Sequence, residues 1–338
     1  MTKIKGWTAH GQGQKLELFD FDLGPLGPEE VEVDIEHCGI CHADLSMIKN
    51  DWGMAQYPLI PGHEVVGKIS ALGSHAKNLQ VGQRVGVGWN ALSCMHCNEC
   101  MTGQHNLCGK AMPTMVGRHG GYADKIRVHW AWAVPLPDGL GSEDIGPLMC
   151  GGIAVFAPFL VFNIKPTSHV GIVGVGGLGH LGVKFAKAWG CEVTAFTSHP
   201  EKAKDALQFG AHQVVSSHDS TALAKLAGSL DLLLVTSDVS LDWQAYMKAL
   251  KPNGRLHVLG AVPEPLSISA FDLIFGQKNV SGSPTGSPPM LSAMLDFAAR
   301  HAIKPQVEHF PMSKVNEALA HLEHGKARYR VVLDNDFA

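Results

Sequence analysis

Residues 169–190 read HVGIVGVGGLGHLGVKFAKAWG, an apolar run that passes through a glycine-rich turn into a helical pattern. The run over 169–174 predicts a buried strand, and residues 177–189 predict a helix. The turn between them has the spacing G-x-G-x-x-G, which allows a sharp bend and lets a pyrophosphate touch the backbone near the helix N-terminus. The stretch therefore predicts a dinucleotide-binding site. Its predicted cofactor-binding residues are Gly174, Gly176, Gly177, Leu178 and Gly179.

The pattern continues on the C-terminal side of this turn. Apolar strand patterns alternate with helical patterns after Cys150, which is the rhythm of a parallel sheet. The predicted strands are 169–174, 192–197, 212–216, 231–236, 255–260 and 278–282, and the predicted helices are 177–189, 201–209, 220–228 and 241–250. Six strands in this rhythm predict a doubly wound α/β domain.

The chain before residue 150 has a different character. Short alternating runs such as 31–35 (VEVDI) are separated by turns that contain glycine and proline. This pattern predicts a mostly β region with long loops. The final part of the chain contains a Ser/Pro/Gly-rich stretch over 281–289, a predicted helix near 290–301 and a strand-like run over 329–333.

The end of the second predicted strand of the α/β domain indicates which dinucleotide binds. An enzyme that uses NAD usually has an acidic residue there, which accepts hydrogen bonds from the ribose 2′-OH. Here Thr197 and Ser198 occupy the strand end and Lys202 follows, with no carboxylate at that point. Lys202 alone would be read as a solvated helix residue. Because the acidic residue is missing, the three side chains favour NADPH, whose 2′-phosphate they can bind.

Four cysteines form the strongest metal signal. Cys94, Cys97, Cys100 and Cys108 have the spacing C-x2-C-x2-C-x7-C, which is typical of a closed tetrahedral zinc site. An iron–sulfur site is disfavoured by the long last gap and by the glycine that follows Cys108. Disulfides are disfavoured because nothing marks the chain as secreted. We expect a structural zinc here.

A second group of metal ligands is scattered along the first half of the chain. Cys41 and His42 stand in the segment CGICHAD, His63 and Glu64 follow a glycine, and Cys150 lies at the change of pattern. Two cysteines and one histidine with an open fourth position are typical of catalytic zinc. Spacing alone does not join these segments. Taken singly, Cys150 is better explained as a core cysteine and His63 as a loop histidine.

Composition excludes several other classes of protein. The 338 residues are enough for two domains, and a net charge of −4 provides no basic field for nucleic acid. The first residues, MTKIKG, lack the apolar run of a secretory signal. The most apolar stretch, 153–162, contains Pro158 and is too short to span a bilayer. We therefore expect a cytoplasmic protein with neither a nucleic-acid nor a membrane partner.

Taken together, these segments resemble the zinc-dependent medium-chain alcohol dehydrogenases, and within them the cinnamyl alcohol dehydrogenase-like group. The segments CGICH, GHE, the four-cysteine lobe, PLMC and GVGGLG arrive in the family's order along the whole chain. The resemblance implies an α/β fold with two domains. A GroES-like, mostly β catalytic domain would comprise residues 1–150 and 286–338, and a Rossmann-type domain with a doubly wound parallel sheet would comprise 151–285.

The resemblance also implies roles for the scattered ligands. Cys41, His63 and Cys150 would hold a catalytic zinc, Glu64 would approach the metal during ligand exchange, and Asp44 would orient His63. With the four-cysteine site this makes two zinc ions per subunit. His42 would reach the cofactor pyrophosphate, and Arg330 is a second candidate for that contact. Trp52, Trp89 and Met115 would line the substrate pocket, although core packing explains them equally well. Cys38 and Cys191 match no ligand position of the family.

One position departs from the family pattern. Relatives carry Ser or Thr two residues after the first zinc ligand, and that hydroxyl begins the proton relay to the product alcohol. Here the position is Ala43, which has no hydroxyl. We hypothesise that water replaces it, held near Ser46 or near the cofactor ribose.

The implied activity is the reversible reduction of a broad range of aldehydes to primary alcohols with NADPH. The substrates would include both aliphatic and aromatic aldehydes, and an assay of a panel of aldehydes would test this range. The resemblance further implies a homodimer that pairs through the edge strand near 278–282. Two alternatives stay open: a zinc-free quinone or enone reductase of the same fold, and a non-enzymatic redox sensor that binds zinc and nucleotide.

Overall fold

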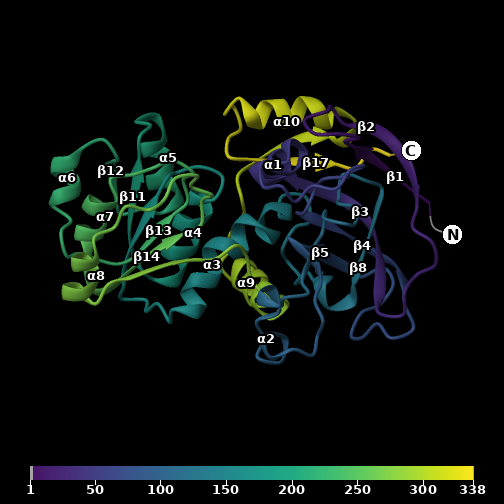
Figure 1. The fold of residues 1–338 in the computed structure, drawn as a ribbon, viewed down its shortest axis with the longest axis horizontal. Coiled ribbons are helices and arrows are strands. Elements are labelled where there is room, and N and C mark those ends of the chain that lie inside the picture. Colours follow the sequence, from purple (N-terminus) through teal and green to yellow (C-terminus); the bar gives the residue numbers. More distant parts are fainter. Residues whose placement is uncertain (1–2, 338) are drawn as a thin grey trace. The chain divides into compact units, whose positions relative to one another are not determined.

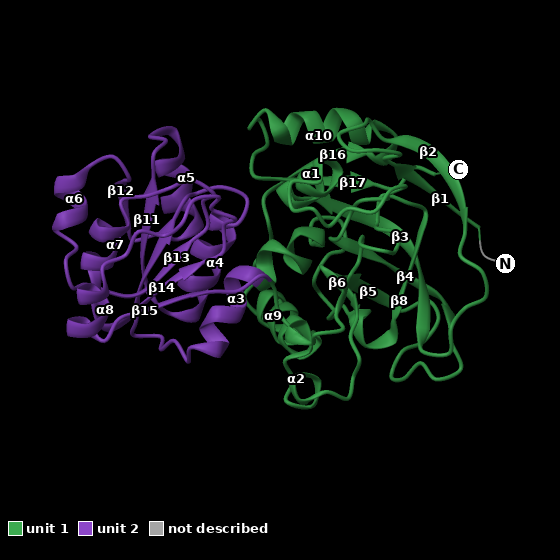
Figure 2. Cartoon of the chain, viewed as in Figure 1, with its two compact units in different colours: residues 1–153, 285–338 green, residues 154–284 purple. Residues whose placement is uncertain are grey.

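The computed structural model describes residues 3–337, and the chain divides into two compact units (Figures 1 and 2). Unit 1 comprises Met1–Ile153 and Thr285–Ala338, and unit 2 comprises Ala154–Pro284. Unit 1 is therefore discontinuous in sequence, because the chain leaves it once and returns to it for its final part.

Unit 2 is built around a six-stranded sheet whose neighbouring strands are all parallel. The strands lie in the order β12–β11–β10–β13–β14–β15. Their bounds are β10 His169–Val173, β11 Glu192–Thr197, β12 Gln213–Ser216, β13 Leu230–Val235, β14 Leu250–Val258 and β15 Asn279–Gly282. The chain builds outward on one side of β10 and then crosses to the other side, so the strand order reverses between β10 and β13. The predicted doubly wound sheet is confirmed.

The helices of this part of the chain are α3 Gly151–Val161, α4 Gly179–Trp189, α5 Glu201–Phe209, α6 Ser220–Ala224, α7 Trp243–Ala249 and α8 Ala270–Gly276. Three of them differ clearly from the prediction. Helix α3 has no predicted counterpart, because it is apolar on all sides and contains Pro158, so the segment carries no amphipathic pattern. Helix α6 ends at Ala224 rather than at 228, because the chain turns there through Gly228 in a left-handed conformation (φ 65°). Helix α8 has no predicted counterpart, since it is short and three of its large apolar side chains face solvent, which removes the amphipathic pattern.

Among the strands of unit 2, the largest difference concerns β14, which starts at Leu250 rather than at 255. The sequence KPNG over 251–254 reads as a turn, yet the strand passes through it with an irregular register against β13. Buried side chains from β10, β11, β13 and α7 form the core on one side of the sheet.

Unit 1 is mostly β, as predicted. Its main sheet has seven strands in the order β16–β17–β3–β4–β5–β9, with β8 also pairing β3. Their bounds are β3 Glu30–Ile40, β4 Val65–Leu72, β5 Arg84–Val87, β8 Lys125–His129, β9 Val134–Pro135, β16 Val307–Pro311 and β17 Arg330–Asp334. All pairs are antiparallel except β16 with β17. Two small sheets complete the unit, formed by β1 Lys3–Thr8 with β2 Glu17–Asp22, and by β6 Asn90–Leu92 with β7 Met112–Pro113.

Long strand β3 is the centre of this unit. It pairs with β17, β4 and β8, and its side chains at Val31, Val33 and Ile35 are buried in the core. The helices of unit 1 are α1 His42–Lys49, α2 Asn98–Met101, α9 Pro288–Arg300 and α10 Val315–Glu323. The predicted helix near 290–301 is α9, and the predicted final strand is β17. The C-terminal end of β3 leads directly into α1, and this junction positions the site.

Candidate active site

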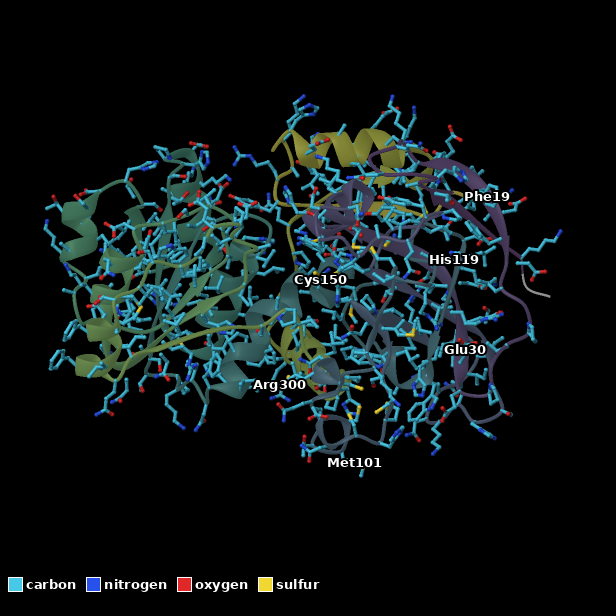
Figure 3. All side chains as sticks on the ribbon, in the orientation of Figure 1. Phe19, Glu30, Met101, His119, Cys150 and Arg300 are labelled. Carbon is cyan, nitrogen blue, oxygen red and sulfur yellow. The ribbon has the colours of Figure 1, made fainter. Side chains whose placement is uncertain are left out.

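Four potential metal ligands from three separate segments converge in unit 1. One ligand atom each of Cys41, His63, Glu64 and Cys150 lies within 4.8 Å of every other, and Figure 3 draws these side chains and labels Cys150. The sequence offered the residues but could not join them by spacing; the structure brings them together.

Strand pairing explains how the first two segments meet. Cys38 of β3 is the register partner of Val65 of β4 in an antiparallel pair. Cys41 follows the end of β3, and His63 and Glu64 precede the start of β4, so both segments leave the sheet at the same end. Cys150 arrives from the single helical turn Gly146–Met149. The sheet thus fixes two of the three segments, and the helical turn before Cys150 supplies the third.

Buried Asp44 holds this group in position. Its Oδ1 accepts hydrogen bonds from His63 Nδ1 (2.9 Å) and from the Gly62 N–H (3.0 Å). Its Oδ2 accepts from the Cys41 N–H (2.9 Å) and from the Tyr122 hydroxyl (2.9 Å). Because Nδ1 of His63 donates to the carboxylate, its Nε2 is directed at the cluster, 3.2 Å from Cys150 Sγ. This is the partner that a metal-bound histidine requires.

The electrostatics of the cluster favour a bound cation. A hydrogen bond with Cys150 holds the pKa of the Cys41 thiol well below its ordinary value, although burial opposes this. Burial disfavours the charged form of His63, but the Asp44 carboxylate raises its pKa well above the ordinary value. Burial also disfavours the charged form of Glu64, and it therefore raises the pKa of this carboxyl. Thiols, imidazole and carboxylate in one buried place are the donor set that zinc prefers.

Glu64 supplies the clearest sign that the cluster is incomplete by itself. Its Oε1 accepts a hydrogen bond from Arg330, whereas its Oε2 is buried without a partner among residues 3–337. A Cβ at Gly39 would lie 2.0 Å from Oε2, so only glycine leaves room for the carboxylate. A buried carboxylate oxygen without a partner is costly unless a cation or donor reaches it. The residues present therefore fit a metal ion.

Arg330, predicted as a candidate for the cofactor pyrophosphate, lies in this cluster. Its side chain is buried, and it donates to the Ile40 carbonyl (3.2 Å) as well as to Glu64. Burial disfavours its charge, but the Glu64 carboxylate raises its pKa above the ordinary value. The pairing was not predicted, because 266 residues separate the partners. Tyr122, which donates to Asp44, was likewise missed, since a single tyrosine carries no sequence signal.

The four cysteines of the lobe also converge. One sulfur from each of Cys94, Cys97, Cys100 and Cys108 lies within 4.8 Å of the others, and Cys94 Sγ is 4.0 Å from Cys100 Sγ. Backbone N–H groups of Cys97 and Lys110 point at Cys94 Sγ and Cys108 Sγ, both at 3.3 Å. The backbone N–H of His96 is the largest of the contacts that lower the pKa of Cys94 to about 6. These four thiols fit a closed metal site, and all eight cysteines of the chain are free of disulfides.

Of the three predicted pocket residues, two lie beside the cluster of Cys41, His63, Glu64 and Cys150. The Trp89 ring meets the His63 ring edge-on at 5.0 Å, and Trp52 meets Trp89 at 6.1 Å. Trp52 is 41% exposed, so an apolar surface continues from the cluster to solvent. Met115 is fully buried among the core residues of unit 1.

The cofactor turn in unit 2 has the geometry that its spacing requires. Gly174 follows β10 with a left-handed φ of 91°, and α4 begins at Gly179. A Cβ at Gly179 would lie 1.8 Å from the Gly174 carbonyl oxygen, so the helix start packs directly on the strand end. The backbone of Gly176, Gly177 and Leu178 spans the turn between them. The arrangement fits a pyrophosphate bound at a helix N-terminus.

The end of β11 has no carboxylate, as the sequence indicated. Thr197 is buried there, with its Oγ1 accepting from the His199 N–H (3.1 Å), and Ser198 is exposed. The next acid along the chain, Glu201, is 3.3 Å from the His199 ring. Lys202 stands half-buried in the first turn of α5.

In unit 1, His42 is the exposed first residue of α1.

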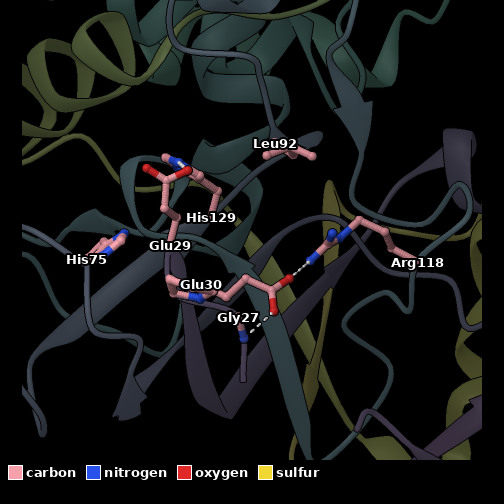
Figure 4. Close-up of a pocket in the computed structure, with 8 residues that line it drawn as sticks. Gly27, Glu29, Glu30, His75, Leu92, Arg118 and His129 are labelled. Atoms are coloured by element: carbon pink, nitrogen blue, oxygen red, sulfur yellow. Dashed lines mark hydrogen bonds and ion pairs between the residues drawn. The ribbon is translucent and has the colours of Figure 1, made fainter. Parts of the chain in front are cut away.

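A separate hollow of about 360 Å³ in unit 1 contains none of the predicted site residues (Figure 4). It is lined by Gly27, Pro28, Glu29, Glu30, His75, Leu92, Arg118 and His129. Glu30 uses one oxygen to accept from Arg118 (3.1 Å) and the other to accept from the Gly27 N–H (3.0 Å). These bonds stabilise the loop before β3, and the lining contains none of the clustered cysteine and histidine ligands. Within residues 3–337, no helix is long and apolar enough to cross a membrane.

Comparison with known proteins agrees with this geometry. Residues 27–138 match the alcohol dehydrogenase GroES-like domain, and residues 177–300 match the zinc-binding dehydrogenase family. The chain is 48% identical to aldehyde reductase AdhA of Synechocystis sp., over 98% of this chain and 99% of that protein. Its structure superposes on a cinnamyl alcohol dehydrogenase of Sorghum bicolor with a TM-score of 0.94 at 36% identity, covering 98% of both chains. The protein CAD of Helicobacter pylori, solved in complex with NADP(H), gives a TM-score of 0.89 at 31% identity, again over 98% of both chains.

Proposed function

Because the chain belongs to the zinc-binding alcohol dehydrogenases, in the cinnamyl alcohol dehydrogenase-like group, we propose that it reduces aldehydes to primary alcohols with NADPH. The observation that carries the proposal is the buried group of Cys41, His63, Glu64 and Cys150, built on the domain that these enzymes share. The resemblance to aldehyde reductase AdhA and to an enzyme solved with NADP(H) favours reduction with NADPH.

Each part of the site has a defined task. Cys41, His63 and Cys150 would hold zinc, which supplies a Lewis acid for the carbonyl oxygen, while NADPH supplies the hydride. Asp44 fixes the His63 ring through Nδ1 and leaves Nε2 for the metal. Glu64, held on one side by Arg330, has a second oxygen available to the metal. We further propose a second, structural zinc at the four-cysteine lobe, giving two per subunit.

NADPH selectivity is proposed to rest on the end of β11. Thr197 and Ser198 place hydroxyls there, and Lys202 lies within the next helical turn. A carboxylate at the strand end would repel a 2′-phosphate, whereas these groups can bind it. The Gly174–Gly179 turn and α4 would bind the pyrophosphate.

Two measurements test the proposed function together. Zinc content and NADPH-dependent turnover are measured on the purified protein, with aliphatic and aromatic aldehydes and with NADH in parallel. We expect about two zinc ions per subunit and a clear preference for NADPH. Cys41→Ser should abolish turnover, whereas Cys38→Ser, a buried neighbour outside the ligand group, should retain it. Full activity with fewer than about two zincs would instead support the zinc-free enone reductase.

A homodimer completes the proposal. Strand β15 is the last strand of the sheet in unit 2, so one of its edges is open to pairing with a second chain. Helix α8, which precedes it, carries Phe271, Ile274 and Phe275 at 69%, 67% and 81% exposure. An exposed apolar helix beside an open strand edge favours association with a second copy.

A further inference from the structure

Ser237 has a buried hydroxyl that the fold does not use. It stands two residues after β13, the strand across which the order of the parallel sheet reverses. Its Oγ is inaccessible to solvent and has no hydrogen-bond partner among residues 3–337. A buried hydroxyl without a partner destabilises a fold, so its presence calls for a ligand or another explanation.

The neighbouring residue shows the contrast. The Thr236 hydroxyl lies 2.9 Å from both the Val173 and the Gly174 carbonyl oxygens, and the Thr236 N–H also donates to Val173. Thr236 therefore ties the end of β13 to the start of the glycine turn. Of these two adjacent hydroxyls, that of Thr236 braces the turn, whereas that of Ser237 has no hydrogen-bond partner in the described part of the chain.

The position of Ser237 is tightly fixed. A Cβ at Gly174 would lie 3.2 Å from Ser237 Cβ, and a Cβ at Gly260 would lie 1.9 Å from the Ser237 carbonyl oxygen. The segment is therefore held between two glycine backbones that approach it closely. A hydroxyl that is held beside the phosphate-binding turn is preorganised for a ligand and does not have to be ordered on binding.

The topology identifies which part of the ligand reaches it. In a doubly wound sheet the dinucleotide lies across the strand ends at the point where the order reverses. Thr197 and Ser198 at the end of β11 would hold the adenosine half, and the N-terminus of α4 would hold the pyrophosphate. The end of β13 would then be left for the nicotinamide half.

We propose that the Ser237 hydroxyl forms a hydrogen bond with the nicotinamide-riboside half of the cofactor, through a ribose hydroxyl or the carboxamide, and so positions that half. The inference rests on the proposed use of NADPH. It adds a positioning residue on the β13 side of the turn, at a place that no sequence motif marks.

Ser237→Ala tests the proposal by ligand binding rather than by turnover. NADPH binding is titrated by the fluorescence of the bound cofactor, and 2′,5′-ADP, which lacks the nicotinamide half, is titrated by calorimetry. The dissociation constant for NADPH should rise about 3- to 10-fold, as for the loss of one net hydrogen bond. That for 2′,5′-ADP should change less than about twofold. The melting temperature without ligand should stay the same or rise, because an unsatisfied hydroxyl has been removed.

Two other variants separate positioning from bracing. Thr236→Val should lower the melting temperature of the ligand-free protein, since its hydroxyl contacts the turn. Ser198→Ala should weaken NADPH and 2′,5′-ADP alike. If Ser237→Ala binds NADPH as tightly as the unmodified protein does, the inference is overturned. It is also overturned if Ser237→Ala has a lower melting temperature and binds NADPH and 2′,5′-ADP more weakly by the same factor. Failure of the unmodified protein to bind NADPH would overturn the proposed function itself.

Discussion

At the scale of single residues, Asp44 determines the geometry of the metal cluster. Its two oxygens accept four hydrogen bonds, including the one from His63 Nδ1 that selects the orientation of the ring. Asp44→Asn replaces one acceptor oxygen with a donor that faces other donors. We expect zinc affinity or turnover to fall about 10- to 100-fold, the usual effect of losing a carboxylate behind a histidine ligand.

The measurement is zinc retention during competition with a chelator, together with turnover at saturating aldehyde. Asp51→Asn is the matched control, because Asp51 is exposed and lies just after the same helix. Equal zinc retention in Asp44→Asn and the unmodified protein would show that the His63 ring is held by its packing alone.

Ala43 gives a second prediction at this scale. The first turn of α1 carries no hydroxyl at this position, and Ser46 is the next hydroxyl in the helix. If water delivers the proton, then Ala43→Thr should raise turnover and reduce the solvent isotope effect by providing a fixed donor. Turnover in H2O and D2O measures this. No change in either quantity would mean that proton transfer through this position does not limit the rate.

At the scale of elements, the four-cysteine lobe is a structural unit that α2 and the turn His105–Leu107 build around the thiols. Cys97→Ser should reduce zinc to about one per subunit and lower the melting temperature by more than about 5 °C. Turnover per correctly folded molecule should change little, since none of these residues belongs to the cluster at which we propose the chemistry takes place. Cys191→Ser, which alters a buried thiol outside both groups, should keep both zincs. A larger loss of turnover than of stability would place the lobe in the chemistry.

The middle of β16 gives a prediction about pH. His309 lies between Asp334 (2.9 Å) and Asp144 (3.1 Å), and Asp334 also accepts from His37 (2.8 Å). Burial opposes the charge on His309, but Asp334 and Asp144 raise its pKa above the ordinary value. A raised pKa in the folded state means that this stabilisation is complete below the pKa of the unfolded chain. It is then lost as the pH rises through the folded value.

His309→Gln should therefore destabilise the protein more at pH 6 than at pH 8.5, by urea unfolding at each pH. The expected effect is modest because the side chain is about one-third exposed and solvent screens the pairs. His218→Gln, at an exposed histidine, is the control and should show no such difference. The same loss at both pH values would mean that His309 acts through packing rather than charge.

At the scale of the whole molecule, the order of strands and helices could be predicted from the sequence, whereas contacts between distant segments could not. The strand and helix rhythm of unit 2 was predictable, because buried parallel strands are continuous apolar runs and the glycine turn has a fixed spacing. The meeting of Cys41, His63 and Cys150 was not predictable from spacing, since it depends on the register of β3 with β4. The partners of Glu64 were hidden for the same reason. Helix α8 was missed because its apolar side chains face outward.

That outward-facing surface supplies the last prediction. Phe271 and Phe275 stack on each other (5.7 Å between ring centres) on α8, directly before the open edge strand β15. Phe275→Asp places a charge in the proposed interface, where burying it would cost more than the association gains. Light scattering coupled to size exclusion should therefore give the mass of two chains for the unmodified protein and of one chain for Phe275→Asp. Leu207→Asp, at a 51% exposed position on α5, should remain dimeric. If Phe275→Asp keeps the mass of two chains, then the pair forms elsewhere on the surface.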